Sequence, residues 1–218
     1  MKVKTIPFFL YASKRLYFKT IEFIEGQKAN HFMVFMNNIN TLYQYGVFHI
    51  TRSNMDDEFE PIRAVLLGFV ITLNTLSCDE HVPEDERNVR TVKDQVRSVL
   101  TNIPFTKVPD HIIIEIFLGQ VFWWNSFPNK YGVSKTMIPR HIMYGLKIDY
   151  NNHYRIACGQ YVQTHEKHGK NMIECTVVTI AIQPTGNRQG RYYFYITLTG
   201  RHLNHRAWTE LPIPDEAV

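Results

Sequence analysis

The sequence predicts a mixed α/β domain over residues 1–150, followed by a small β-rich module over residues 151–218. Three observations predict this organisation. Strand-like apolar segments alternate with amphipathic helical segments in the first part. The helical periodicity stops near residue 150, and short segments rich in β-branched and aromatic residues follow it, separated by glycine-containing turns. Short strands of this kind favour a small all-β, barrel-like module.

The first half of the α/β part contains strands on both sides of a helix. Residues 2–25 combine apolar, aromatic and β-branched side chains, which predict strands. Residues 28–43 predict a helix, because apolar side chains recur three and four positions apart until Gly46. The next predicted elements are a strand over residues 47–51, a short helix that opens at Pro61 and a strand over residues 70–73.

Two longer helices and four short strands complete the predicted elements. One helix starts near Pro83, carries valines at spacings of three and four, and ends before Pro104. The second covers residues 110–124 and is apolar on most sides, which predicts burial. The strands predicted after residue 150 cover residues 161–164, 175–182, 190–198 and 206–211.

The composition allows a packed globular protein and limits the function classes. The 218 residues are 44% hydrophobic and 20% charged, which argues against wholesale disorder, and the net charge of +4 is compatible with a nucleic-acid partner. Three widely spaced cysteines without a C-x-x-C pair do not support a zinc finger or a disulfide framework, and they favour reduced thiols in the nucleus or cytoplasm. No apolar run approaches the ~20 residues of a membrane helix, so no membrane partner is expected.

The sequence has none of several common catalytic motifs. It contains no H-E-x-x-H, no G-x-S-x-G and no glycine-rich phosphate loop. His165 and His168 fall in a predicted loop, and residues 122–124 (Phe-Trp-Trp) are interpreted as packing residues rather than a base-stacking platform. The candidate chemistry therefore rests on carboxylates.

Asp56 and Glu86 are the candidate catalytic and metal-binding residues. Asp56 follows a predicted strand, and Glu86 lies in the first turn of the predicted helix that starts near Pro83. Mg²⁺ prefers carboxylate and water oxygens, and two hard cations ~3.5–4 Å apart suit phosphoryl transfer. Two alternatives without metal binding remain open. Asp56 would lie in a solvated acidic turn, and Glu86 would only stabilise the start of its helix through the helix dipole.

Three basic residues follow Glu86 on the same side of its helix. At ~100° per residue, Arg90, Lys93 and Arg97 fall on one side with Glu86, away from most of the valines. A basic ridge of this kind suits a phosphate backbone, so these three residues are the candidate nucleic-acid contacts. The alternative is a solvated face with i,i+4 ion pairs such as Glu86–Arg90.

The order of these motifs resembles copia-type retrotransposon integrases, which belong to the retroviral integrase superfamily. Residues 55–61 (Met-Asp-Asp-Glu-Phe-Glu-Pro) look like the second-aspartate motif of that family, and residues 86–91 (Glu-Arg-Asn-Val-Arg-Thr) resemble its E-R-x-x-R-T motif. Residues 124–128, 138–140 and 143–145 resemble the helices that follow the family's catalytic motifs and their T-P-x-x-x-x-x-G-like turn. Residues 159–162 begin a segment similar to the family's small β module. The resemblance covers nearly the whole chain.

This resemblance implies a ribonuclease H-like mixed sheet flanked by helices, and a metal site of two aspartates and a glutamate that joins DNA ends with Mg²⁺ or Mn²⁺. Asp56 and Glu86 match the second and third acidic positions, with Glu84 as a weaker alternative to Glu86. Asp57 stands where the family pattern has glycine. The family's first aspartate precedes the segment matching residues 1–9, so an N-terminally truncated core that is catalytically incomplete is expected.

The resemblance leaves the enzymatic activity open. The leading expectation is a DNA-binding, integrase-derived polynucleotidyl transferase fragment with little activity alone, and a homo-oligomer is compatible with it. The alternatives are a non-catalytic DNA-binding or assembly module, and a decayed transposon fragment without a stable product. The β-rich module after residue 150 and the basic ridge are common to the first two readings.

Overall fold

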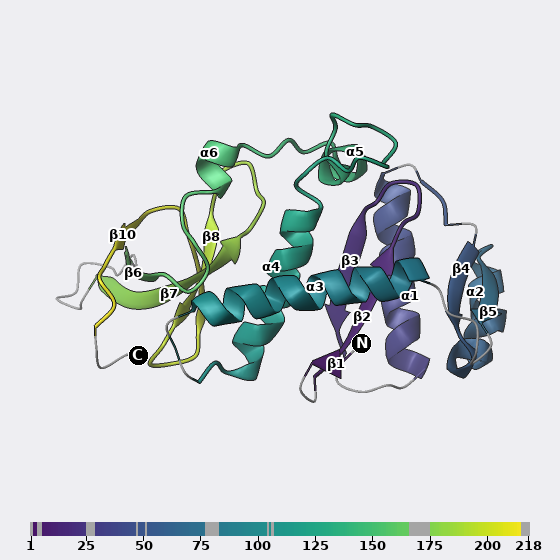
Figure 1. Cartoon of the computed structure of the whole chain (residues 1–218), viewed down its shortest axis with the longest axis horizontal. Helices are drawn as coiled ribbons and strands as arrows, with labels where there is room; N and C mark the ends of the chain where they lie inside the picture. The colour runs from purple at the N-terminus through teal and green to yellow at the C-terminus, as the bar shows by residue number, and fades with distance from the viewer. Residues whose placement is uncertain are drawn as a thin grey trace. The chain divides into compact units, whose positions relative to one another are not determined.

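The chain forms two compact units, each of which draws on two separate stretches of sequence (Figure 1). Unit 1 comprises residues 1–91 and 127–145, and unit 2 comprises residues 92–126 and 146–218. The computed structural model describes residues 2–3, 6–24, 29–46, 48–50, 52–76, 83–103, 105, 107–165 and 175–214. Because each unit joins segments that lie far apart in the chain, the division between them is not a single point along the sequence.

An antiparallel sheet and a helix open unit 1 (Figure 1). Strands β1 (Lys2–Val3), β2 (Ile6–Ala12) and β3 (Lys19–Phe23) pair in that order, and α1 covers Ala29–Tyr45. Phe9 of β2 contacts two phenylalanines of α1, with ring centroids 4.8 Å from Phe32 and 5.3 Å from Phe35. The predicted strands within residues 2–25 and the helix predicted over residues 28–43 are therefore confirmed.

A second, parallel sheet of two strands also belongs to unit 1. Strand β4 covers Arg52–Asp56, β5 covers Thr72–Leu76, and each residue of β4 faces one residue of β5 in an unbroken register. The two helices between them, η1 (Asp57–Ile62) and α2 (Arg63–Gly68), form the crossover that a parallel pair requires. Helix α5 (Pro139–Tyr144) also lies in this unit, and the unit boundary falls inside α3 (Pro83–Asn102), after Thr91.

Two strands differ from the sequence predictions. Residues 48–50 have no regular structure, and residues 47 and 51 lie outside the described residues, so the strand predicted over 47–51 is wrong. Pairing with β5 fixes the observed strand at Arg52–Asp56, which makes Asp56 its last residue. The strand predicted over residues 70–73 starts later, because Val70 has a φ of +61° and forms a turn.

The described strands of unit 1 form two sheets, one antiparallel and one parallel. The ribonuclease H-like expectation is one mixed sheet, and the described strands do not pair across the two sheets. One buried cluster nonetheless joins them, because it includes Leu73 of β5, and Phe9 and Tyr11 of β2 pack against it. Unit 1 is mixed α/β, as predicted, while the ribonuclease H-like arrangement remains a prediction.

Unit 2 contains an antiparallel sheet of five strands, in the order β10-β6-β7-β8-β9. The strands are β6 (Tyr161–His165), β7 (Thr176–Pro184), β8 (Tyr192–Ile196), β9 (His202–His205) and β10 (Trp208–Glu210). Strand β10 lies within the strand predicted over residues 206–211, whereas β9 was not predicted. The described sheet is open, since β9 and β10 do not pair with each other, so the closed barrel is not observed.

Helix α4 (Asp110–Trp124) packs against β7 of this sheet. The contact is close at Gly119, where an added Cβ would lie 3.0 Å from the Gln183 side chain. Six residues of α4 are buried, as the apolar sequence of residues 110–124 predicts. A short helix, α6 (Tyr150–His153), precedes β6, and Val162, Phe194 and Leu203 belong to the buried cluster of the sheet. In the described part of the chain, no helix has the length and hydropathy to cross a membrane.

Candidate metal and nucleic-acid site

Asp56 is the last residue of β4 and pairs with Leu76, the last residue of β5. Because the two strands are parallel, their carboxyl ends meet at one edge of the sheet. The backbone of Asp56 therefore lies at the carboxyl edge of this sheet, where β5 also ends before the chain continues to α3. The side chain of Asp56, like those of Asp57 and Glu58, lies outside the described residues.

Glu86 lies in the first turn of α3, together with Glu84 and Asp85. The unsatisfied N–H groups of a helix start favour negative charge, which accounts for three acidic residues in this turn. The Glu86 side chain is exposed. An exposed carboxylate at a helix start is accessible to a cation from solvent.

Glu84 interacts with two lysines of unit 1. The Lys14 Nζ lies 3.9 Å from the Glu84 carboxylate. Lys19 of β3 is only 2% exposed, and this burial lowers its pKa to about 7, while the negative charge of Glu84 acts in the opposite direction. These interactions give Glu84 a structural role beside the two lysines.

Asp85 is the third carboxylate of this helical turn. Burial raises its pKa, the neighbouring charge of Glu84 raises it further, and the charge of Lys14 lowers it. Asp85 therefore belongs to the acidic first turn of α3, where the charges of Glu84 and Lys14 both act on its carboxyl group.

No group of three or more His, Cys, Asp or Glu side chains that would hold a metal ion occurs among the side chains that the structure describes. Glu86 is among those side chains and Asp56 is not. The parallel β4–β5 pair places the Asp56 backbone beside Leu76, the last residue before the connection to α3. The metal site therefore remains a prediction.

Arg63, at the start of α2, contacts Glu60 and β5, and this role was not predicted from the sequence. Its Nε donates a hydrogen bond of 2.5 Å to Glu60 Oε1, and its Nη2 donates one of 2.7 Å to Glu60 Oε2. Its Nη1 also donates to the Leu73 carbonyl oxygen at 2.9 Å, which ties α2 to β5. The hydrogen bond from Arg63 lowers the pKa of Glu60. The i,i+3 spacing of a glutamate and an arginine is the sequence signal for this pair.

The candidate nucleic-acid residues follow one another along α3. Arg90 and Arg97 are exposed, whereas Lys93 is half-buried. Arg97 donates a hydrogen bond of 2.6 Å to Asp94 Oδ1, so part of its charge is balanced within the helix. Val92 and Val96 are buried, which agrees with the prediction that the valines face away from the basic residues. Arg90 is therefore the strongest of the three candidates for a phosphate contact.

The comparisons with known proteins add one structural similarity. No family model matches the chain, and no curated protein matches it. Among solved structures, the chain is similar to a chain in the cryo-EM structure of the simian T-cell lymphotropic virus intasome in complex with PP2A regulatory subunit B56 gamma. The TM-score is 0.45 at 12% identity, over 98% of this chain and 78% of that one. At these values, the similarity decides neither the fold nor the family.

Proposed function

We propose that this chain is a DNA-binding protein related to retrotransposon integrases, in which Asp56 and Glu86 bind Mg²⁺ or Mn²⁺ at one edge of unit 1. The observation that carries the proposal is the parallel pairing of β4 and β5, with Asp56 at the carboxyl end of β4. The proposal also draws on the ordered motifs of residues 55–61 and 86–91.

The chain connectivity limits how far Glu86 can lie from the edge that carries Asp56. Seven peptide steps separate Leu76 from Pro83, so the Cα atoms of these residues lie at most ~25 Å apart. Glu86 follows Pro83 within the first turn of α3. This connection is short enough to allow a site in which a strand end and a helix start supply oxygen ligands to one cation.

A bound divalent cation would stabilise the negative charge that develops on a phosphoryl oxygen. In this proposal, Asp56 and Glu86 hold the cation, and the exposed Arg90 binds a DNA phosphate one helical turn beyond Glu86. Phosphoryl transfer with two metal ions needs more than two carboxylates, one of which bridges the ions. We therefore expect the chain to bind DNA and to have little strand-transfer activity alone.

A strand-transfer assay with Mg²⁺ or Mn²⁺ tests the catalytic part of the proposal. We expect weak or no joining of DNA ends by the wild-type chain, and loss of any metal-dependent activity in the Asp56→Asn and Glu86→Gln variants. The Glu84→Gln variant is the matched control, because Glu84 lies in the same helical turn beside Lys14. Robust turnover that Asp56→Asn abolishes would show that the expectation of low activity is wrong.

A second candidate function is DNA binding without metal chemistry, and the exposure of Arg90 and Arg97 on α3 favours it. Removing a side chain that binds a phosphate should weaken duplex binding and reduce the slope of log K against log salt by ~1. Arg90→Ala and Lys93→Ala should show both effects, whereas Lys135→Ala, at an exposed lysine outside α3, should show neither.

The Glu86→Gln variant distinguishes the two candidate functions. If metal binding is part of DNA binding, Glu86→Gln weakens the metal-dependent component. If α3 acts only as a basic surface, binding survives Glu86→Gln and still requires Arg90. The absence of DNA binding at low salt would rule out both functions.

A further inference from the structure

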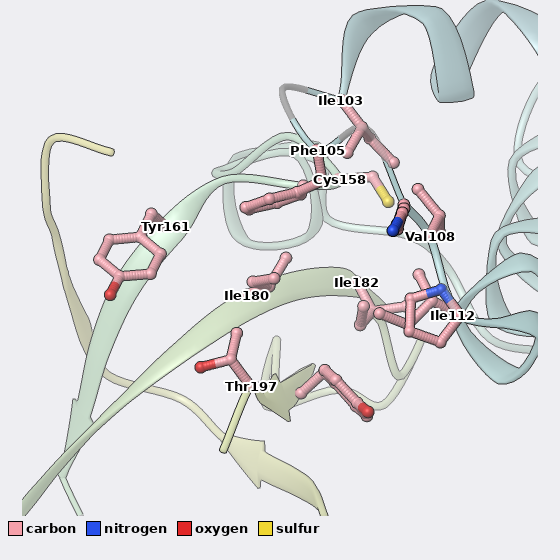
Figure 2. A pocket seen from close by; sticks show the side chains of 13 residues that line it. Ile103, Phe105, Val108, Ile112, Cys158, Tyr161, Ile180, Ile182 and Thr197 are labelled. Atoms are coloured by element: carbon pink, nitrogen blue, oxygen red, sulfur yellow. The ribbon is translucent and has the colours of Figure 1, made fainter. Parts of the chain in front are cut away.

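A mainly apolar pocket lies entirely within unit 2 (Figure 2). Its volume is about 290 Å³, and its lining comes from the segment between α3 and α4, from α4, from the turn before β6, and from strands β6, β7 and β8 with the residue that follows β8. Figure 2 shows the side chains of Ile103, Phe105, Val108 and Ile180 around this hollow. Segments far apart in the sequence therefore form a single binding-sized cavity.

The interior of the pocket is uncharged and its rim carries a cation. Ile112 and Ile180 are each 6% exposed, and burial raises the pKa of the lining thiol of Cys158 to about 12, which keeps that thiol neutral. Lys107 is the one charged side chain among the described lining residues, and it is exposed. An apolar interior below one exposed cation favours an amphipathic ligand with a single negative charge.

The volume limits the size of that ligand. An apolar cavity of about 150 Å³ in another protein binds benzene, so about twice that volume suits two fused aromatic rings. The charged end of such a ligand would stay at the solvent-exposed rim, since burial of an unpaired carboxylate is costly. The rings would replace water against the isoleucines and Phe105.

We propose that this pocket binds small aromatic carboxylates of about two rings, with the rings among the lining isoleucines and the carboxylate beside Lys107. The ligand would approach from the exposed rim of Lys107, Pro109 and Thr197. This site does not depend on the proposed metal and DNA chemistry, because all its lining residues belong to unit 2.

Titration of the full chain with 2-naphthoate, observed through ¹³C-labelled isoleucine methyl groups, tests this proposal. We expect shifts at the four lining isoleucines and none at three isoleucines in the core of unit 1. The lining residues are Ile103, Ile112, Ile180 and Ile182, and the unit 1 controls are Ile39, Ile62 and Ile71. No shift at millimolar 2-naphthoate, or shifts centred on the unit 1 methyl groups, would overturn the proposal.

Neutral 2-naphthamide separates the contribution of Lys107 from that of the apolar walls. Lys107→Gln should weaken 2-naphthoate binding about two- to fivefold, as expected for an exposed ion pair, and leave 2-naphthamide binding unchanged. Lys135→Gln, at an exposed lysine of unit 1, should change neither. Equal effects of Lys107→Gln on both probes would overturn the proposed anion preference.

A pocket-filling substitution tests the location independently. Val108 lines the pocket and is half-buried, so Val108→Trp adds bulk at the cavity and should abolish binding of both probes. Retained affinity in folded Val108→Trp would contradict the location. Since Lys107 is exposed, the Lys107→Gln comparison tests the proposal even if Val108→Trp does not fold.

Discussion

At the scale of single residues, the most unusual side chain is Lys19, a lysine of β3 that is 2% exposed. Burial lowers its pKa to about 7 from an ordinary value of 10.5, against the opposing effect of Glu84. Between these two pH values, the unfolded chain binds one proton more than the folded chain. The free energy of unfolding should therefore rise with pH across this window, by up to ~1.4 kcal/mol per pH unit from this group. Below pH 7 both states are protonated, and the cost of the buried charge is fully present.

Urea unfolding between pH 6 and pH 10 measures this effect. We predict that Lys19→Met removes the Lys19 contribution to the slope, so the difference in stability between variant and wild type shrinks as pH rises above 7. Lys14→Met is the control, because Lys14 also neighbours Glu84 but its side chain is 74% exposed. A constant difference between Lys19→Met and wild type over this range would contradict the prediction.

Cys158 and Cys175 provide a second test at residue scale. Burial raises the pKa of Cys158 to about 12, whereas Cys175 is exposed. Alkylation proceeds through the thiolate, and a thiol with this pKa is ~10⁻⁴ ionised at pH 8. We predict that iodoacetamide modifies Cys158 at least ~100-fold more slowly than Cys175 in the folded protein, as measured by mass spectrometry of the two peptides.

Denaturation provides the control for the cysteine comparison. In concentrated urea, Cys158 loses its surroundings, so the two rates should approach each other. Equal rates in the native protein would show that the Cys158 thiol is not held in an apolar environment.

At the scale of elements, the turn before β6 depends on Gly159. This residue has a φ of +89°, and an added Cβ would lie 2.8 Å from Ile103 Cγ1 at the end of α3. We predict that Gly159→Ala lowers the free energy of unfolding by ~2–3 kcal/mol, because backbone strain and a core contact act together. Denaturant unfolding measures this loss.

Gly145 is the matched control, since it ends α5 with a φ of +67° and an added Cβ would meet nothing within 4 Å. Gly145→Ala should therefore cost only the backbone strain, ~1 kcal/mol. Equal losses in the two variants would show that the Ile103 contact contributes nothing.

The helices were more predictable than the strands, for a physical reason. The predicted helix over residues 110–124 coincides with α4, because local periodicity and an apolar sequence determine it. Strand β4 lies beyond the predicted 47–51, because its limits depend on pairing with β5, twenty residues away. Strand β9, which was not predicted, likewise depends on pairing with β8.

The candidate site was predictable only where it depends on local helix spacing. The acidic first turn of α3 and its basic residues follow from helix spacing alone. Burial of Lys19 beside Glu84, and the contacts of Arg63 with Glu60 and β5, depend on residues brought together by folding. The pocket of unit 2 was not predicted, since its lining joins residues from Ile103 to Thr197.

At the scale of the whole molecule, the two units contain different candidate sites. Unit 1 contains Asp56 and Glu86, whereas the apolar pocket belongs to unit 2. The sequence predicted a change from an α/β to a β-rich pattern near residue 150. In the structure, unit 1 includes residues before and after segment 92–126, and unit 2 includes residues before and after segment 127–145. Such discontinuity depends on contacts between distant segments, which periodicity in a single sequence does not reveal.

Paramagnetic broadening by Mn²⁺ in NMR spectra of the full chain tests most directly whether Asp56 and Glu86 share one divalent cation. We predict that Mn²⁺ broadens the backbone amide signals at the end of β4 and at the start of α3 together. Asp56→Asn or Glu86→Gln should remove both effects, while Glu84→Gln should retain them. Broadening at one location only, or broadening that survives both Asp56→Asn and Glu86→Gln, would contradict the shared site.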